Sequence, residues 1–309
     1  MHYYMVFFLA LASGMEYEQA RITALASQYV DDNPMTQPLD ETNLVTTVLS
    51  AFKNHMQLVS YHFVLSDSVD PNASSFGHTL AAYNNSHVDS VVGNLSPQLQ
   101  NLLNASNTGN PAQPCAKYQF LGEFLHAYAD TFSHRDRSDT PYDAFNLVGL
   151  GTGHGASAGS LPDYTYDDGA NSNISWETRE ARTLEAEKGM FNILAGYAPG
   201  RLSGVSFSSI EATLKEFNAI KEDGSNMGKS TSEKTQVLQK AINDLISSGK
   251  VKLKDSSGNV LNSVNLSDSD VGGYNKDRAE KNRNSLLGGL KESDYPGTCL
   301  PRGTRCKPL

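Results

Sequence analysis

Three side chains suited to metal binding recur at helical spacing near the middle of the chain. His126, Asp130 and His134 occupy positions i, i+4 and i+8, so in a helix they share one face. Two imidazoles and a carboxylate suit a borderline-soft divalent ion such as zinc. The alternative is a surface histidine pair with a helix salt link. Apolar residues flank this face and should turn it inward, where unpaired polar groups are costly, so the pattern favours a metal site.

Further side chains along the chain could complete such a site. The histidines among them lie in apolar or glycine-rich segments, and the carboxylates follow a helical stretch or a Leu-Pro pair. Taken singly, each is more typical of a core or loop residue than of a ligand. Taken together, they suggest a cluster of two or three metal ions. The candidates are His2, Asp31 or its neighbour Asp32, His62, His154 and Asp163.

The elements that must position these residues are mostly helices. Apolar residues recur at helical spacing in most of the chain outside two Gly-, Ser-, Asn- and Pro-rich stretches, 66–114 and 136–174. We predict a mostly α fold: a compact multi-helix domain over 1–222, with loop-rich insertions. A small C-terminal α(+β) extension, 223–309, follows it. The predicted helices cover residues 2–13, 16–30, 41–53, 117–133, 175–197, 207–221 and 233–248, with shorter patches near 76–84 and 97–104.

Two details of the extension are predicted from local signals. Residues 222–232 have the composition of a linker, and a hairpin is expected around 256–259. The rest of the extension is a loosely patterned tail. Within it, Cys299 and Cys306 could close a short disulfide loop or remain thiols, because three cysteines in total do not decide the redox compartment.

The apolar run 4–13 resembles the core of a secretory signal. It lacks a positively charged leader and is too short to span a bilayer, so we interpret it as a buried helix of the mature domain. No other stretch approaches membrane-spanning length. We therefore expect a soluble protein, cytoplasmic or exported without a recognisable signal peptide.

The order of the candidate ligands is similar to that of the zinc-dependent phospholipase C and S1/P1 nuclease superfamily. Within that superfamily the chain most resembles the bacterial branch known as DUF6765, over about residues 2–200. The most specific match is the segment 125–134. The other matching segments are 2–4, 26–32, 61–63, 153–155 and 162–163.

The resemblance implies an all-α fold with three zinc ions. Asp31, His62, His126 and Asp130 would hold the first ion, and Asp130 would bridge to a second ion near His2. The third would be held by His134, His154 and Asp163.

Departures from the family pattern affect specific positions. The free amino group of an N-terminal tryptophan is absent, so His2 would bind through its side chain. The spacing from His126 to His134 is two residues shorter than in the better-known enzymes. Ala158 stands where a carboxylate is expected four residues after His154, which makes Asp163 the substitute.

These features predict a zinc-dependent hydrolase that cleaves a phosphodiester with a metal-bound water. Asp31 would orient the water or accept its proton, and Arg135 would contact the substrate. The formal net charge of −9 favours a phospholipid over nucleic acid, and no stable nucleic-acid complex is expected. The alternatives are an S1/P1-type nuclease and a non-enzymatic, metal-stabilised binding module. A toxin or effector with an immunity or delivery partner is a further hypothesis.

Overall fold

The structure, a computed structural model, describes residues 2–32, 114–133, 176–198, 204–220, 227–255 and 257–266. These residues form six α-helices and one two-stranded hairpin, so the mostly α prediction is confirmed for this part of the chain. Several predicted features lie outside the described residues. They are the helix and helical patches at 41–53, 76–84 and 97–104, the loop-rich stretch 66–114 except for its last residue, the loop-rich stretch 136–174, and the tail beyond 266.

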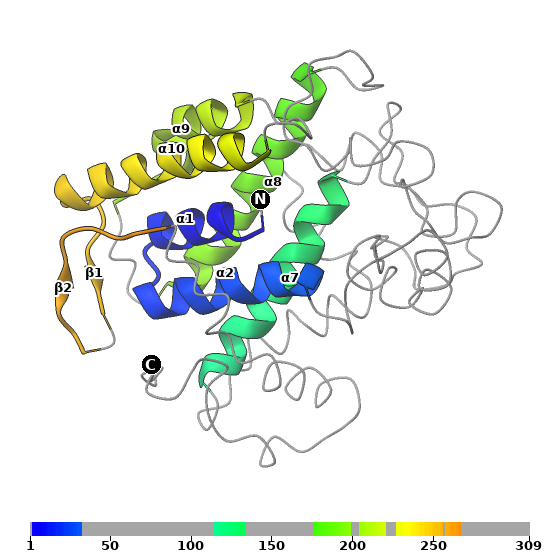
Figure 1. The fold of residues 1–309 in the computed structure, drawn as a ribbon. Coiled ribbons are helices and arrows are strands. Elements are labelled where there is room, and N and C mark those ends of the chain that lie inside the picture. The colour runs from blue at the N-terminus through cyan, green and yellow to red at the C-terminus, as the bar shows by residue number, and fades with distance from the viewer. Residues whose placement is uncertain are drawn as a thin grey trace, which may run out of the picture.

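The N-terminal helix α1 (Tyr4–Ser13) lies at the centre of the described fold. It is apolar all round, and residues 5–13 are all buried, as expected for a helix covered by neighbours on every side. In Figure 1 it lies between α2 and α10, and it also packs against α8. The interpretation of 4–13 as a buried helix is confirmed.

A tight turn joins α1 to α2 (Tyr17–Asp32). Gly14 ends α1 in the left-handed conformation, with a φ of 97°, which costs glycine little because it has no Cβ. The predicted end of the second helix at residue 30 was two residues too early. The helix continues through Asp31 and Asp32, where the described residues of this segment end.

The remaining helices follow the predicted positions closely. They are α7 (Pro114–Ser133), α8 (Trp176–Tyr197), α9 (Phe207–Ala219) and α10 (Met227–Ser247). The linker prediction was wrong for residues 227–232, which form the first turns of α10. Extending an amphipathic helix costs little per residue compared with starting one, so polar residues beside a strong helix can join it.

The predicted hairpin is confirmed. Strands β1 (Leu253–Lys254) and β2 (Val260–Leu261) are antiparallel, with Leu253 opposite Leu261. The Asp255 carboxylate closes the turn, because it accepts hydrogen bonds from the backbone N–H groups of Ser257 and Asn259, both at 2.8 Å.

One hydrophobic core crosses the predicted domain boundary at residue 222. Leu238 and Ile242 of α10 and Val251 beyond it belong to the same buried cluster as the apolar residues of α1. The helix that opens the predicted extension therefore packs directly on the N-terminal helices. None of the helices in the described ranges combines the length and apolarity needed to cross a membrane.

Two side chains of α10 bind the segment that follows the hairpin. The Gln239 side-chain amide donates to the Val264 carbonyl and accepts from the Leu266 N–H at 2.6 Å, while Asn243 accepts from the Val264 N–H at 3.0 Å. These side chains supply the hydrogen bonds that a neighbouring strand would otherwise provide. They hold Val264 and Leu266 in the core.

Replacing Gln239 with alanine is expected to lower the free energy of unfolding by about 2 kcal/mol. Both hydrogen bonds to the backbone would be lost, and groups near the buried Leu266 would lack partners. Urea denaturation followed by circular dichroism measures this. Gln236→Ala is the matched control, since that exposed amide contacts Ser232 of its own helix. Equal losses for the two variants would contradict the role given to Gln239.

Candidate metal centre

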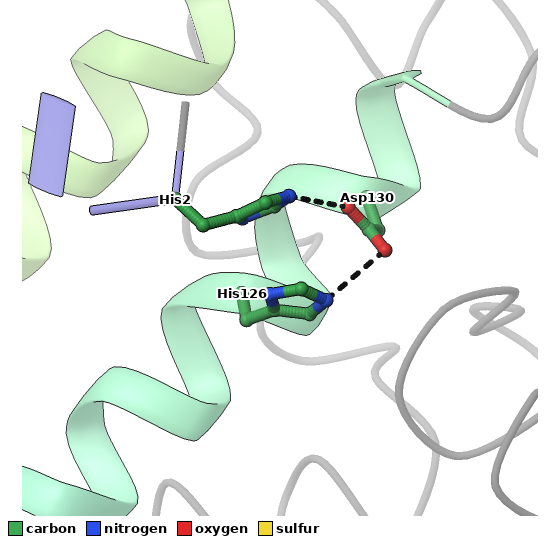
Figure 2. A group of neighbouring side chains, drawn as sticks. All are labelled: His2, His126 and Asp130. Carbon is green, nitrogen blue, oxygen red and sulfur yellow. Dashed lines mark ion pairs between the residues drawn. The ribbon is translucent and has the colours of Figure 1, made fainter. Parts of the chain in front are cut away.

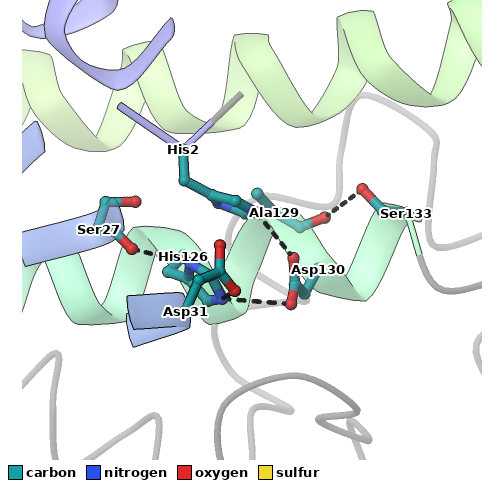
Figure 3. Close-up of polar contacts among 7 residues, drawn as sticks. All are labelled: His2, Ser27, Asp31, His126, Ala129, Asp130 and Ser133. Carbon is teal, nitrogen blue, oxygen red and sulfur yellow. Dashed lines mark hydrogen bonds and ion pairs between the residues drawn. The ribbon is translucent and has the colours of Figure 1, made fainter. Parts of the chain in front are cut away.

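The candidate site lies where three segments meet. His2 lies two residues before the start of α1, Asp31 lies in the last turn of α2, and His126 and Asp130 lie one turn apart on α7. Figure 3 shows these four side chains pointing toward one another. The packing of α2 against α7 brings them together.

A glycine lets these two helices approach closely. A Cβ added at Gly122 of α7 would lie 2.2 Å from the carbonyl oxygen of Thr23 and 2.9 Å from the backbone nitrogen of Ser27. Only a residue without a side chain fits against the α2 backbone there. This contact lies one turn before His126 and holds the Ser27 carbonyl beside its ring.

The Asp130 carboxylate contacts a different histidine with each of its oxygens (Figure 2). Its Oδ1 lies 3.3 Å from His2 Nε2, and its Oδ2 lies 3.4 Å from His126 Nε2. On the other side, Asp31 Oδ1 lies 3.6 Å from His126 Nε2. The two imidazole rings are tilted by 31° with their centres 3.9 Å apart. The Asp130 carboxylate therefore lies between the two histidines, with one oxygen facing each of them.

The backbone fixes the tautomer of His126. Its Nδ1 lies 2.9 Å from the carbonyl oxygen of Ser27, which can only accept, so Nδ1 carries a proton and donates it. Nε2 is then left facing the carboxylates of Asp31 and Asp130. An imidazole whose second nitrogen is held in this way is the usual form of a metal-binding histidine.

Exposure differs across the cluster. The side chain of His126 has no exposed surface and that of Asp130 keeps 4%, whereas His2 keeps 20% and Asp31 keeps 35%. The cluster therefore has a buried floor and an edge, formed by His2 and Asp31, that solvent reaches.

The pKa values of the two histidines are shifted in opposite directions. Burial lowers the pKa of His126, but the carboxylates of Asp31 and Asp130 and the hydrogen bond to Ser27 outweigh it, so the pKa is raised. For His2, burial and the neighbouring His126 outweigh the carboxylates and lower the pKa. Without another cation nearby, the two carboxylates favour the protonated form of His126.

Each pair of contacting ligand atoms is spaced as two ligands of one divalent ion would be. Atoms bound to one zinc at about 2.1 Å in tetrahedral geometry lie about 3.4 Å from each other. The three contacts, 3.3, 3.4 and 3.6 Å, match this value. They are longer than the roughly 2.8 Å of a charge-assisted hydrogen bond. Ligand atoms of His2, His126 and Asp130 all lie within 4.8 Å of one another.

The structure thus brings together four of the predicted site residues: His2, Asp31, His126 and Asp130. Asp32, the alternative to Asp31, belongs to α2, but its side chain is not among those described. Five predicted residues lie outside the described ranges and stay predictions. These are His62, His134, Arg135, His154 and Asp163.

Sequence reasoning missed two contributors to this site. The Ser27 carbonyl gives no sequence signal, because every residue has a carbonyl. Gly122 does give one: a glycine in the middle of a strongly helical pattern lowers helix stability and calls for a packing reason.

The fold and the site together define the class of this protein: it is mostly helical and has a buried histidine/aspartate cluster. The chain belongs to DUF6765, a family of unknown function, whose model matches residues 1–295. The expectation that the resemblance ends near residue 200 was wrong for this family, because the match takes in most of the C-terminal extension. No curated protein and no solved structure matches the chain.

Proposed function

We propose that this protein is a zinc-dependent phosphodiesterase of the phospholipase C type, centred on His2, Asp31, His126 and Asp130. The observation that carries the proposal is the convergence of His126 Nε2 with two carboxylate oxygens at 3.4 and 3.6 Å, while Nδ1 is committed to the Ser27 carbonyl. Acceptor atoms held this close together are stabilised by a cation between them and not by each other, so the arrangement suits a divalent ion. The other oxygen of Asp130 faces His2, which favours a second ion on that side.

The remaining ligands of the proposal are predicted from the resemblance. His62 would join the first ion, and His134, His154 and Asp163 would hold a third. With these, two or three zinc ions would be bound per chain. Zinc, when bound, supplies a Lewis acid for phosphoryl oxygens and lowers the pKa of a coordinated water toward 7.

The residues of the chain have separable roles in this proposal. His126 and Asp130 are buried and form the rigid floor of the site, with His126 oriented by the Ser27 carbonyl. Asp31 is the carboxylate that solvent reaches, so it is placed to orient the attacking water and accept its proton. Arg135, just beyond α7, is proposed to bind a remaining phosphate oxygen.

A phospholipid or a small phosphodiester is the proposed substrate class. The formal net charge of −9 repels a long polyanion, whereas a single phosphodiester needs only local positive charge. A choline-phosphate ester, a dinucleotide and single-stranded DNA, each incubated with zinc-loaded protein, separate the lipase-like from the nuclease-like activity. Zinc-loaded protein inactive on all three would favour the non-enzymatic, metal-stabilised module instead.

Asp31→Asn is expected to lower kcat/KM on the preferred substrate by about 100-fold or more, because an amide cannot accept the proton. Asp32→Asn is the matched control and should stay within about threefold of the wild type. Zinc content, measured on the same samples, shows whether the loss comes from chemistry or from metal binding. A larger loss in the Asp32 variant would transfer the role to that residue.

A further inference from the structure

A second buried polar cluster lies away from the candidate metal centre, where α8, α9 and α10 meet. Glu187 of α8 and Asn218 of α9 have no exposed surface, and Lys234 of α10 keeps 4%. Asn218 Nδ2 donates to Glu187 Oε2 at 3.2 Å. The Lys234 ammonium lies 4.9 Å from the centre of the Phe217 ring. Adjacent residues of α9 thus contact α8 and α10.

This cluster and the metal centre lie on opposite sides of α8. Gly189 faces α7, since a Cβ there would lie 2.1 Å from the hydroxyl of Tyr128. Glu187 is two residues earlier, a rotation of about 200° around the helix, and so points away from α7. Changes at Glu187 can therefore be made without touching His126 or Asp130.

The surroundings of Glu187 favour an uncharged carboxyl. One oxygen accepts from Asn218, and Oε1 has no hydrogen-bond partner in the described part of the chain. A carboxylate in this setting would lose most of its hydration without replacement. Burial accordingly raises the pKa of Glu187 well above its usual value, although Asn218 and Lys234 act in the opposite direction.

We propose that Glu187 is a pH-dependent latch: its protonated carboxyl holds α9 against α8, and deprotonation loosens this junction. Lys234 from α10 and Glu180 from α8 are the charged groups that act on Glu187, and α9 contributes the neutral Asn218 amide. The buried face of α1, which also packs against α8 and α10, carries no charged residue.

The direction of the effect follows from the two states. The carboxyl has its ordinary pKa when the junction is open and a raised pKa when it is closed. Protons are therefore bound more tightly in the closed state. The stabilisation is complete below the lower value and is lost as the pH rises through the higher one.

Hydrogen–deuterium exchange of the full chain tests this. The opening constant of residues 207–219, corrected for intrinsic exchange, is measured from about pH 5 to pH 9. In the wild type it should rise about tenfold per pH unit until the buried carboxyl is ionised, and then level off. In Glu187→Gln, which keeps the shape and a polar group for Asn218, it should stay flat. Identical pH profiles in the two proteins would overturn the proposal.

A lysine variant separates the latch from an ion pair. Lys234→Met removes a charge that favours the ionised carboxyl, so the rise in the opening constant should continue to a higher pH before it levels off. If a Glu187–Lys234 ion pair held the helices, Glu187→Gln and Lys234→Met would both open α9 at every pH, and the proposal would fail. Infrared difference spectra of wild type and Glu187→Gln provide a second readout. The wild type should show an additional carboxylic-acid C=O band, and its absence across the pH range would also refute the latch.

Discussion

Replacing His126 with alanine is expected to remove at least one zinc ion from each chain and to reduce the rise in melting temperature that zinc produces. His126 Nε2 is the atom that the carboxylates of Asp130 and Asp31 both face, at 3.4 and 3.6 Å. A bound ion stabilises the folded state by about 1.4 kcal/mol for each tenfold excess over its Kd, so loss of the ion removes that whole contribution.

The metal-free protein should also be weakened. His126 is fully buried, and its Nε2 lies 3.4 Å from the Asp130 carboxylate, which favours the protonated ring. Removing one partner of a buried pair costs about 3 kcal/mol, because the other charge keeps its desolvation penalty. Elemental analysis and thermal unfolding, each with and without a chelator, measure the two effects separately.

Ser27→Ala is the matched control for this variant. It keeps the backbone carbonyl that accepts from His126 Nδ1, and the lost hydroxyl has no hydrogen-bond partner in the described residues. Zinc content and stability should therefore stay close to wild type. A His126→Ala protein that is folded and still carries the wild-type amount of zinc would refute the proposed centre, and with it the phosphodiesterase.

Local sequence patterns were sufficient for most of the described helices. The apolar run 4–13 has no polar face, which predicts burial on all sides, and α1 is buried in this way. The spacing of His126 and Asp130 predicts that they share a helical face, and both are buried on α7. Such inferences need only the period of the helix.

The assembly of the site could not be read from periodicity. Residues 2, 31 and 126 belong to three separate segments, and their grouping was expected from a resemblance. Whether Asp31 reaches His126 depends on α2 continuing two residues beyond its predicted end and on its close approach to α7. Both are matters of tertiary packing, which a single sequence states only indirectly.

The cluster around Glu187 was missed for a related reason. Glutamate is a good helix former and is usually exposed, so Glu187 fits the helix predicted over 175–197 without contradiction. Its burial follows from α9 lying over that side of α8, where Asn218 contacts it. The surface it faces is set by a neighbouring helix and is not encoded in its own segment.

Gly122→Ala is expected to be strongly destabilising, although alanine is the better helix former. The new Cβ would lie 2.2 Å from the Thr23 carbonyl oxygen, 2.8 Å from Ala26 Cβ and 2.9 Å from the Ser27 nitrogen. These atoms belong to the backbone or are fixed to it, so a rotamer change cannot relieve the clash. The overpacking cost, about 3 kcal/mol or more, exceeds the helix-propensity gain of about 1 kcal/mol.

Gly196→Ala, near the end of α8, is the matched control. No atom lies within 4 Å of the Cβ it would add, so the same substitution should leave stability unchanged or raise it by up to about 1 kcal/mol. Urea denaturation of both variants isolates the helix contact from the intrinsic effect of the substitution. If both variants gained stability, the close approach of α2 and α7 would be wrong.

Gly122→Ala also tests how the packing of α2 against α7 affects metal binding. A shift of α2 away from α7 moves Asp31 and the Ser27 carbonyl away from His126, which loosens the ring and removes a carboxylate from its Nε2. Outer contacts of this kind typically change metal affinity by about 10- to 100-fold. Zinc titration of folded Gly122→Ala should therefore show weakened binding, while Gly196→Ala binds as the wild type does. A folded Gly122→Ala protein with wild-type affinity would mean that the site does not depend on how closely the two helices approach.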